Sequence, residues 1–171
     1  LAGHFNRLVA EALTAPTKAV HALPLLGAAE IAQLDRWNET AVDYPQDSCI
    51  HQLFALQAAR TPDAVAVLCG AEQLTYAQLH AKANQLAHYL RHQYQVGPDV
   101  LVGLCLERSL EMVIGMMAIL KAGAAYVPLD PDYPTERLAF MAEDAQLPVI
   151  LSMTAQAGLA LPAMVLLDDP R

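Results

Sequence analysis

Hydrophobic residues near the N-terminus recur every three to four positions, which is the spacing of one helix face. Within residues 1–13 this face consists of Phe5, Leu8, Val9, Ala12 and Leu13. The prolines and the glycine of residues 14–27 cannot continue a helix, and a second short helix is predicted from Ala28 to about Trp37. Residues 38–47 are polar and are expected to be extended. The first 47 residues therefore indicate the end of one unit followed by a linker.

From Ser48 onward, short apolar runs alternate with helical patterns. Strands are predicted at residues 65–69, 73–74, 100–106, 125–129, 149–153 and 164–167. Helices are predicted to end at Thr61, to run from Thr75 past Leu90, from Ser109 to Lys121, and from Pro134 to about Ala145. Because the strands are apolar throughout and alternate with helices, we expect an α/β fold with a mainly parallel sheet and helices on both faces.

The ends of these helices carry recognisable signals. Thr75 and Gln78 have the spacing of a capping box, in which each side chain can bond the other residue's backbone N–H. Ser109 can cap the next helix, and Gly123 suits the left-handed position at its end. Pro134 is expected in the first turn of the last helix.

Composition and charge narrow the possible classes. The 171 residues are 55% hydrophobic and 16% charged, with ten Lys and Arg against eighteen Asp and Glu, a net charge of −8. So acidic a chain lacks the basic surface that binds nucleic acid, and no nucleic-acid partner is expected. Three cysteines without close spacing make neither a disulfide framework nor a zinc site. A reducing, cytoplasmic location is therefore expected.

Two apolar stretches raise the question of a membrane span. Residues 112–120 are too short to cross a bilayer, and residues 145–167, although uncharged, contain two prolines and several polar side chains. We interpret the second stretch as two buried strands joined by a loop, and expect no membrane partner. The sequence opens at Leu1 without a methionine or a secretory signal, which predicts a piece of a longer chain.

Candidate chemistry is sparse. No two of the eight glycines lie within five residues of each other, which excludes the glycine-rich loops that cradle phosphate. His88 and His92 share a helix face but lack a third metal ligand, so a solvated face is expected. The pair Cys49 and His51 is expected to serve packing, and two further cysteines are expected to be inert core residues. They are Cys69 and Cys105.

Three charged residues remain as candidates. Lys121 ends a helix, where a cation complements the helix dipole, so a structural role is favoured over catalysis. Asp130 and Asp132 follow a strand, where sites form in α/β sheets, but they also suit a proline-containing turn and helix cap. From the residues alone, the chain is an α/β protein without identifiable catalytic machinery.

Two motifs resemble a known family. Residues 74–79, LTYAQL, are similar to the first core motif of nonribosomal peptide synthetase adenylation domains, and residues 120–131, LKAGAAYVPLDP, resemble the second almost letter for letter. Residues 23–47 are similar to the linker that precedes such domains, and residues 1–13 to the last helix of a condensation domain. The resemblance implies a condensation-domain helix at 1–13, a linker at 14–47, and the N-terminal part of an adenylation (AMP-binding) domain at 48–171. In terms of fold, the resemblance implies that residues 48–171 form the first part of the large N-terminal subdomain of an adenylate-forming enzyme. This part would stop before the phosphate-binding loop.

This chain departs from the family pattern at three positions. Gln78 replaces a glutamate, Ala124 replaces a frequent glycine, and Gln95 stands where a helix-ending glycine is common. Glutamine serves a capping box as well as glutamate. The substitution at Gln95 predicts a slightly different helix end within the same fold.

The resemblance also implies a function for the complete protein. Such an enzyme activates an amino acid with Mg-ATP as an aminoacyl-adenylate, and then transfers it to the phosphopantetheine thiol of a carrier protein. The implied partners are the rest of the adenylation domain, an upstream condensation domain and a downstream carrier protein. The family's catalytic motifs lie beyond residue 131, so no catalytic, cofactor-binding or metal-binding residue can be transferred to this sequence. The 171-residue fragment is therefore expected to be inactive and to hold no cofactor itself.

Two alternatives remain open from the sequence. The chain could be part of a stand-alone acyl- or aryl-acid ligase, although such enzymes need neither the linker nor the condensation-like helix. It could also be a non-catalytic binding or scaffolding module. The amino acid activated and the peptide product cannot be deduced, because the pocket-lining segment is absent.

Overall fold

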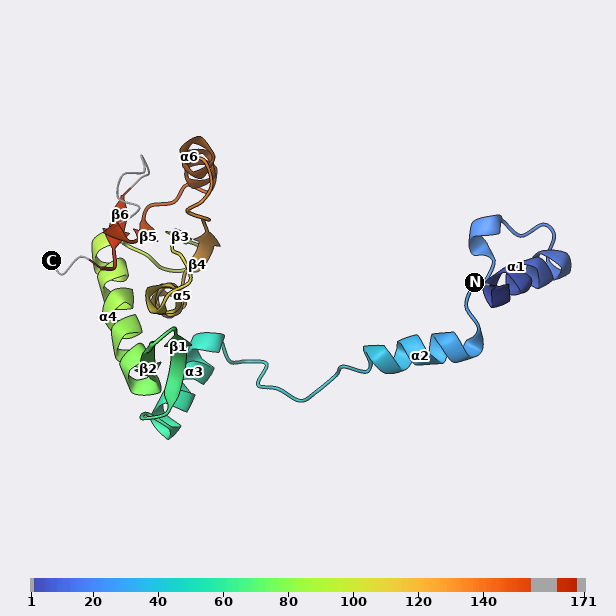
Figure 1. The fold of residues 1–171 in the computed structure, drawn as a ribbon, viewed down its shortest axis with the longest axis horizontal. Coiled ribbons are helices and arrows are strands. Elements are labelled where there is room, and N and C mark those ends of the chain that lie inside the picture. The colour runs from blue at the N-terminus through green and yellow to red at the C-terminus, as the bar shows by residue number, and fades with distance from the viewer. Residues whose placement is uncertain (1, 155–162, 169–171) are drawn as a thin grey trace. The chain divides into compact units, whose positions relative to one another are not determined.

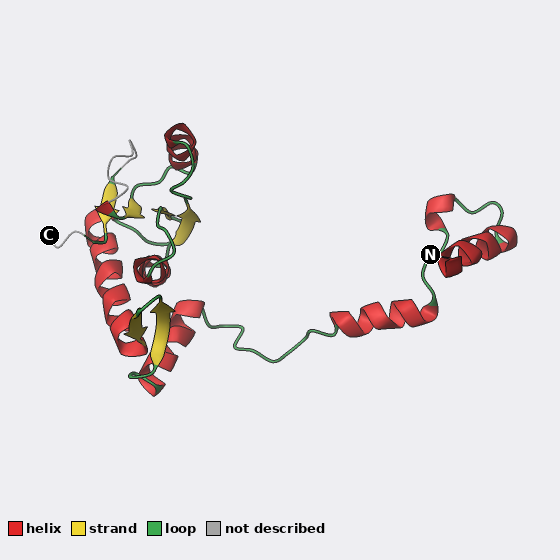
Figure 2. Ribbon diagram, in the orientation of Figure 1, coloured by secondary structure: helices red, strands yellow, loops and turns green. Residues whose placement is uncertain are grey.

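The computed structural model describes residues 2–154 and 163–168. The chain divides into two compact units, Leu1–Gln46 and Asp47–Arg171. Figure 1 traces both units from the N-terminus to the C-terminus, and Figure 2 shows their helices and strands. Each unit is described by itself below.

Within residues 2–46, the regular elements of the first unit are helices joined by loops. They are α1 (Ala2–Thr14), the 3-10 helix η1 (Val20–Ala22) and α2 (Ala28–Asn38). The two predicted α-helices are confirmed, each within one residue of its expected end. None of the three helices contains a buried residue, and Phe5 and Leu13 on the apolar face of α1 are 66% and 78% exposed. The amphipathic pattern of α1 therefore forms a helix without a core against which to pack.

The second unit opens with a helix and a hairpin. Helix α3 (Ile50–Arg60) precedes strands β1 (Val65–Cys69) and β2 (Glu72–Thr75), which pair antiparallel in a sheet of their own. The turn passes through Gly70 at φ +60°, a conformation that glycine adopts without steric cost. Both predicted strands are present, but they lie outside the parallel sheet.

The main sheet has four parallel strands in the order β4-β3-β5-β6. The strands are β3 (Leu101–Leu104), β4 (Ala125–Pro128), β5 (Ile150–Ser152) and β6 (Met164–Leu166). All four agree with the predicted strands, although each is shorter than expected. Pro128 has no N–H to donate to a ladder and lies in the edge strand β4, where none is needed on the outer side. Most of the loop expected between the last two strands lies outside the described residues.

Helices cover both faces of this sheet, as predicted (Figure 1). Helices α4 (Tyr76–Tyr94) and α5 (Leu110–Ala122) pack with Val102, Leu104 and Leu151 on one face. Helix α6 (Thr135–Asp144) packs with Cys105 and Ile150 on the other. Successive strand residues thus alternate between two apolar clusters, and the α/β class is confirmed.

Two buried glycines let these layers approach closely. A Cβ at Gly103 in β3 would stand 2.7 Å from Cγ1 of Ile150 and 3.0 Å from Cδ1 of Leu147. A Cβ at Gly115 in α5 would stand 2.9 Å from Cδ1 of Leu104. Side chains at either position would require neighbouring core residues to shift.

The predicted caps are largely confirmed. Gln78 N donates to Thr75 Oγ1 at 3.2 Å while Thr75 N donates to Gln78 Oε1 at 2.9 Å, and Met112 N donates to Ser109 Oγ at 3.1 Å. Gly123 has φ +91°, and Ala124 N donates to Ile119 O, which completes a Schellman motif.

Two expected helix ends are corrected. Gln95 ends α4 at φ 53°, so it adopts the same left-handed conformation that a glycine would provide, and no different helix end arises. Pro134 lies at the N-cap of α6 and not in its first turn. Among residues 2–154 and 163–168, no helix combines the length and the apolar character needed to cross a bilayer.

Candidate functional site

The carboxyl ends of the four parallel strands meet at one edge of the sheet, which is where ligands bind in open α/β sheets. Backbone hydrogen bonds join the residues just beyond these strands. Leu129 N donates to Leu104 O, Cys105 N to Leu151 O, and Leu167 N to Ser152 O. This edge is therefore the candidate functional region of the second unit.

Asp130 lies at this edge, two residues after the end of β4. Its Oδ1 accepts a hydrogen bond from Asp132 N at 3.1 Å, and Tyr133 N donates to Asp130 O. The carboxylate thus closes an Asx turn, as the turn interpretation predicted. The predicted helix cap is wrong, because the N-cap of α6 is Pro134 and no side chain caps it. Asp132 is exposed, and the guanidinium carbon of Arg137 in α6 lies 4.1 Å from the centre of the Tyr133 ring.

Cys105 is fully buried at this edge. Burial, and then the nearby Asp130 carboxylate, raise the pKa of its thiol. The buried Ser152 hydroxyl donates to Cys105 O at 3.1 Å. The predicted core position of Cys105 is therefore confirmed. A thiol held in its protonated form is a poor nucleophile, which agrees with the expectation that Cys105 is inert.

Thr154 and Asp168 join the ends of β5 and β6. Asp168 Oδ1 accepts from Thr154 N at 2.7 Å and from Thr154 Oγ1 at 3.0 Å. Burial raises the pKa of Asp168, but the two hydrogen bonds from Thr154, together with one from the backbone of Asp168 itself, leave the pKa lowered. The sequence did not predict this pair, because residues fourteen positions apart carry no local signal that they meet.

Lys121 lies in the last turn of α5, at the opposite edge of the sheet where β4 begins. Its Nζ donates to Asn84 Oδ1 at 2.8 Å, lies 3.2 Å from His80 Nδ1, and stands 5.8 Å from the centre of the Phe54 ring. Lys121 therefore ties α5 to α4 and α3, which agrees with the structural role predicted for it. Its partners were not predicted, although the spacing of His80 and Asn84, one helical turn apart, places them on one face of α4.

Burial determines the charges in this cluster. It lowers the pKa of Lys121, and burial followed by the Lys121 cation lowers the pKa of His80. The neutral imidazole can therefore accept a hydrogen bond from the ammonium group. Such a cluster joins the helices through partly buried side chains.

The other candidates are surface features. His88 and His92 are exposed with their rings 6.5 Å apart, as the solvated-face prediction requires. Cys49 is exposed at the N-cap of α3, so the packing role predicted for it is wrong, while Cys69 is half-buried. Within residues 2–154 and 163–168, no three His, Cys, Asp or Glu side chains gather to hold a metal ion.

A groove of about 340 Å³ opens on the other side of the sheet from α6. Its wall is formed by α4, α5 and the end of β6, and the residues include Lys82, Leu86, Tyr89, Glu111 and Leu166. It contains one basic and one acidic side chain, and its surface is about as polar as it is apolar.

Comparison with known proteins defines the class of this chain. The family model described as "AMP-binding enzyme" matches residues 54–169, well over half of the sequence. The chain therefore belongs to the family of AMP-binding enzymes, as part of a nonribosomal peptide synthetase adenylation domain.

Particular relatives agree with this class. The chain is 53% identical over 153 residues to one of the linear gramicidin synthase proteins of Brevibacillus parabrevis, a match that covers 89% of this chain and 2% of that protein. It is 46% identical over 153 residues to tyrocidine synthase 3 of Brevibacillus parabrevis, covering 88% and 2%.

A solved structure extends the likeness to three dimensions. The AMPPNP-bound nonribosomal peptide synthetase FmoA3 matches with a TM-score of 0.75 and 30% identity, over 97% of this chain and 18% of that one. The chain thus spans a small part of each protein that it matches.

Proposed function

We propose that this chain comes from a nonribosomal peptide synthetase whose adenylation domain activates an amino acid with Mg-ATP. The amino acid carboxylate attacks the α-phosphate, which forms the aminoacyl-adenylate and releases pyrophosphate. A phosphopantetheine thiol on a carrier protein then takes the acyl group as a thioester and releases AMP. The observation that carries this proposal is the 53% identity to a linear gramicidin synthase across nearly the whole chain.

The described residues do not fit a site for ATP and magnesium by themselves. Of the carboxylates at the carboxyl edge, Asp130 accepts a hydrogen bond within its own turn and Asp168 accepts two from Thr154. The glycines are isolated along the sequence, so no glycine-rich loop is available to wrap a triphosphate. We therefore assign no step of the reaction to this chain's residues and propose that the 171-residue fragment is inactive.

The residues of the two core motifs have an architectural role in this proposal. Those of the first cap α4, and those of the second end α5, form β4 and close the turn after it. They build the sheet edge beside which the rest of the adenylation domain would complete a site.

The proposal extends to organisation and location. Residues 1–13 are assigned to the end of a condensation domain, 14–47 to a linker, and 48–171 to the opening of the adenylation domain. The partners are the remaining adenylation domain, the upstream condensation domain and a downstream carrier protein. The location proposed is the cytoplasm.

Amino-acid-dependent ATP–pyrophosphate exchange tests the function. The complete parent protein is assayed with a panel of amino acids, and the 171-residue chain serves as the matched negative. We expect exchange with one or a few amino acids for the parent and none for the fragment. Activation of acyl or aryl acids in place of amino acids would identify a stand-alone ligase, and a parent without any exchange would favour a scaffolding module.

A variant of Lys121 tests the architectural assignment. Lys121→Met in the parent keeps the aliphatic stem but removes the ammonium group that binds Asn84. We expect the exchange rate to stay within a few-fold of wild type while thermal stability falls slightly. A loss of several orders of magnitude in a folded variant would show that Lys121 is catalytic.

A further inference from the structure

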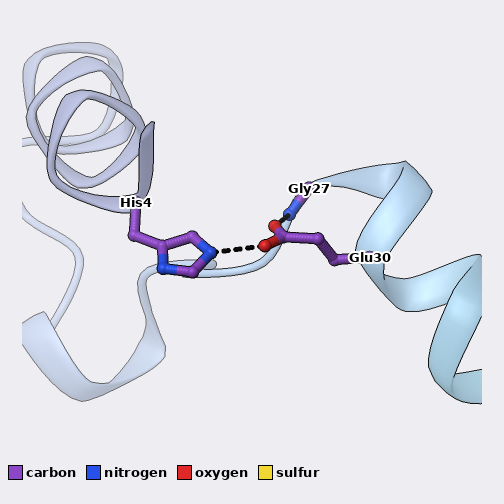
Figure 3. A network of polar contacts seen from close by, with 3 residues as sticks. All are labelled: His4, Gly27 and Glu30. Carbon is purple, nitrogen blue, oxygen red and sulfur yellow. Dashed lines mark hydrogen bonds and ion pairs between the residues drawn. The ribbon is translucent and has the colours of Figure 1, made fainter. Parts of the chain in front are cut away.

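One carboxylate in the first unit serves two helices. Glu30 lies in the first turn of α2, and its Oε2 accepts from Gly27 N at 2.7 Å, which satisfies a free N–H at the helix start. Its Oε1 lies 2.5 Å from His4 Nε2 on α1 (Figure 3). The same side chain therefore caps α2 and joins it to α1.

The neighbouring charges favour this arrangement. Arg7 lies one turn after His4 on α1, and its Nη1 would stand 3.4 Å from a Cβ added at Gly27. The hydrogen bond from Gly27, then the one from His4, lower the pKa of Glu30, and the charges of His4 and Arg7 add to this. Glu30 is thus held as a carboxylate facing two basic side chains of α1.

Little else fastens these helices. Neither α1 nor α2 contains a fully buried residue, although Leu8 on α1 and Leu26 before α2 are half-buried, so the helices enclose no apolar core. Within residues 2–46, the contact of His4 with Glu30 is the hydrogen bond between side chains that connects α1 with α2.

We propose that His4 and Glu30 form a latch that fastens α2 to α1, so that α2 belongs to the body that precedes it and is not free linker. The freely reorienting chain then begins after Asn38, where residues 39–49 contain neither helix nor strand. This shortens the linker proposed from sequence, residues 14–47, to its last part. The inference does not depend on the proposed enzymatic function.

Distances between spin labels test the latch in the full 171-residue chain. Labels are placed on exposed positions of the two helices, through Ala10→Cys on α1 and Gln33→Cys on α2. Cys49 and Cys69 are replaced by serine, while Cys105 is buried and stays. We expect a narrow distance distribution in this background.

Two variants separate the latch from the cap. His4→Ala removes only the contact with α1, and we expect the separated population to rise about twofold to fivefold, the effect of an exposed ion pair, with α2 still helical. Glu30→Ala removes both bonds and should also fray the start of α2. His21→Ala is the matched control, because His21 is an exposed histidine outside both helices.

The outcomes decide between latch and linker. Broadening in His4→Ala and Glu30→Ala, but not in His21→Ala, supports the latch. A distribution that is already broad in the background chain, or one that His4→Ala leaves unchanged, overturns it. Circular dichroism on each variant separates a released helix from an unfolded one.

Discussion

The two units of this chain are stabilised in different ways. The second unit places a parallel sheet between helices and buries three apolar clusters, in which Val102, Ile150 and Leu151 are completely inaccessible. The first unit has helices of comparable length, but none of their residues is buried, and a polar contact between His4 and Glu30 joins them.

This difference shows why similar local patterns do not give similar stability. Amphipathic spacing in α1 is as clear as in the helices of the second unit, yet a helix draws most of its stability from packing its apolar face. Without a covering surface, Phe5 and Leu13 remain exposed. Substitutions in the first unit should therefore cost little, and equivalent ones in the second should cost much.

The largest contrast is expected between two leucines. Leu151→Ala removes a fully buried side chain in β5 and should destabilise the second unit by about 2–5 kcal/mol, because a cavity remains. Leu13→Ala, on the exposed face of α1, should change stability by less than about 0.5 kcal/mol. Chemical denaturation followed by hydrogen exchange measures the stability of each unit separately. Equal effects at both sites would contradict the comparison.

Two glycines offer a contrast of opposite sign. Gly103→Ala should destabilise the second unit by about 1–3 kcal/mol, because its Cβ meets Ile150 and Leu147. A Cβ at Gly3 in α1 would meet nothing within 4 Å. Gly3→Ala should therefore stabilise α1 by up to about 1 kcal/mol and raise its helicity. Thermal unfolding measures the first change, and circular dichroism of residues 1–46 the second. A neutral Gly103→Ala would mean that the core yields more readily than its packing indicates.

The end of α4 tests strain within the second unit. Gln95→Gly should stabilise the second unit by about 0.5–1 kcal/mol, because relief of the left-handed strain outweighs the added flexibility of the unfolded chain and the loss of the exposed bond from Nε2 to His92 O. Gln95→Ala is the control, because it keeps the strain and loses the bond from Nε2 to His92 O. Denaturant midpoints should rank Gly above Gln above Ala. A lower midpoint for Gln95→Gly than for wild type would contradict this account.

The smallest effect concerns pH. The pKa of His80 is lowered in the folded second unit, by burial and then by Lys121, so the unfolded chain binds that proton more tightly. Stability should therefore rise with pH through about 6.5 and fall as the pH drops through the folded-state pKa. His80→Gln should flatten this dependence, whereas His88→Gln, on an exposed site of the same helix, should leave it unchanged. Unfolding midpoints between pH 5 and 8, a range around the ordinary histidine pKa, provide the measurement. Equal slopes in all three proteins would exclude His80 as the source.

Local signals predicted the α-helices and strands of the described residues, but not the 3-10 helix Val20–Ala22. The capping box at Thr75 and Gln78 and the glycine at Gly123 act within one helical turn, so their bonds follow from neighbouring residues. Alternation of apolar strands with helices likewise predicts a sheet that is covered on both faces. The two core motifs predicted the family.

Tertiary structure alone decided which distant residues meet. The hairpin of β1 and β2 forms its own sheet, Asp168 bonds Thr154, and Lys121 meets His80 and Asn84. Such contacts depend on how whole elements pack, because a side chain gains a partner across forty residues only after the sheet has brought the helices together. Exposure is decided in the same way: the sequence determines that α1 has an apolar face, and only the surrounding structure decides whether that face is covered.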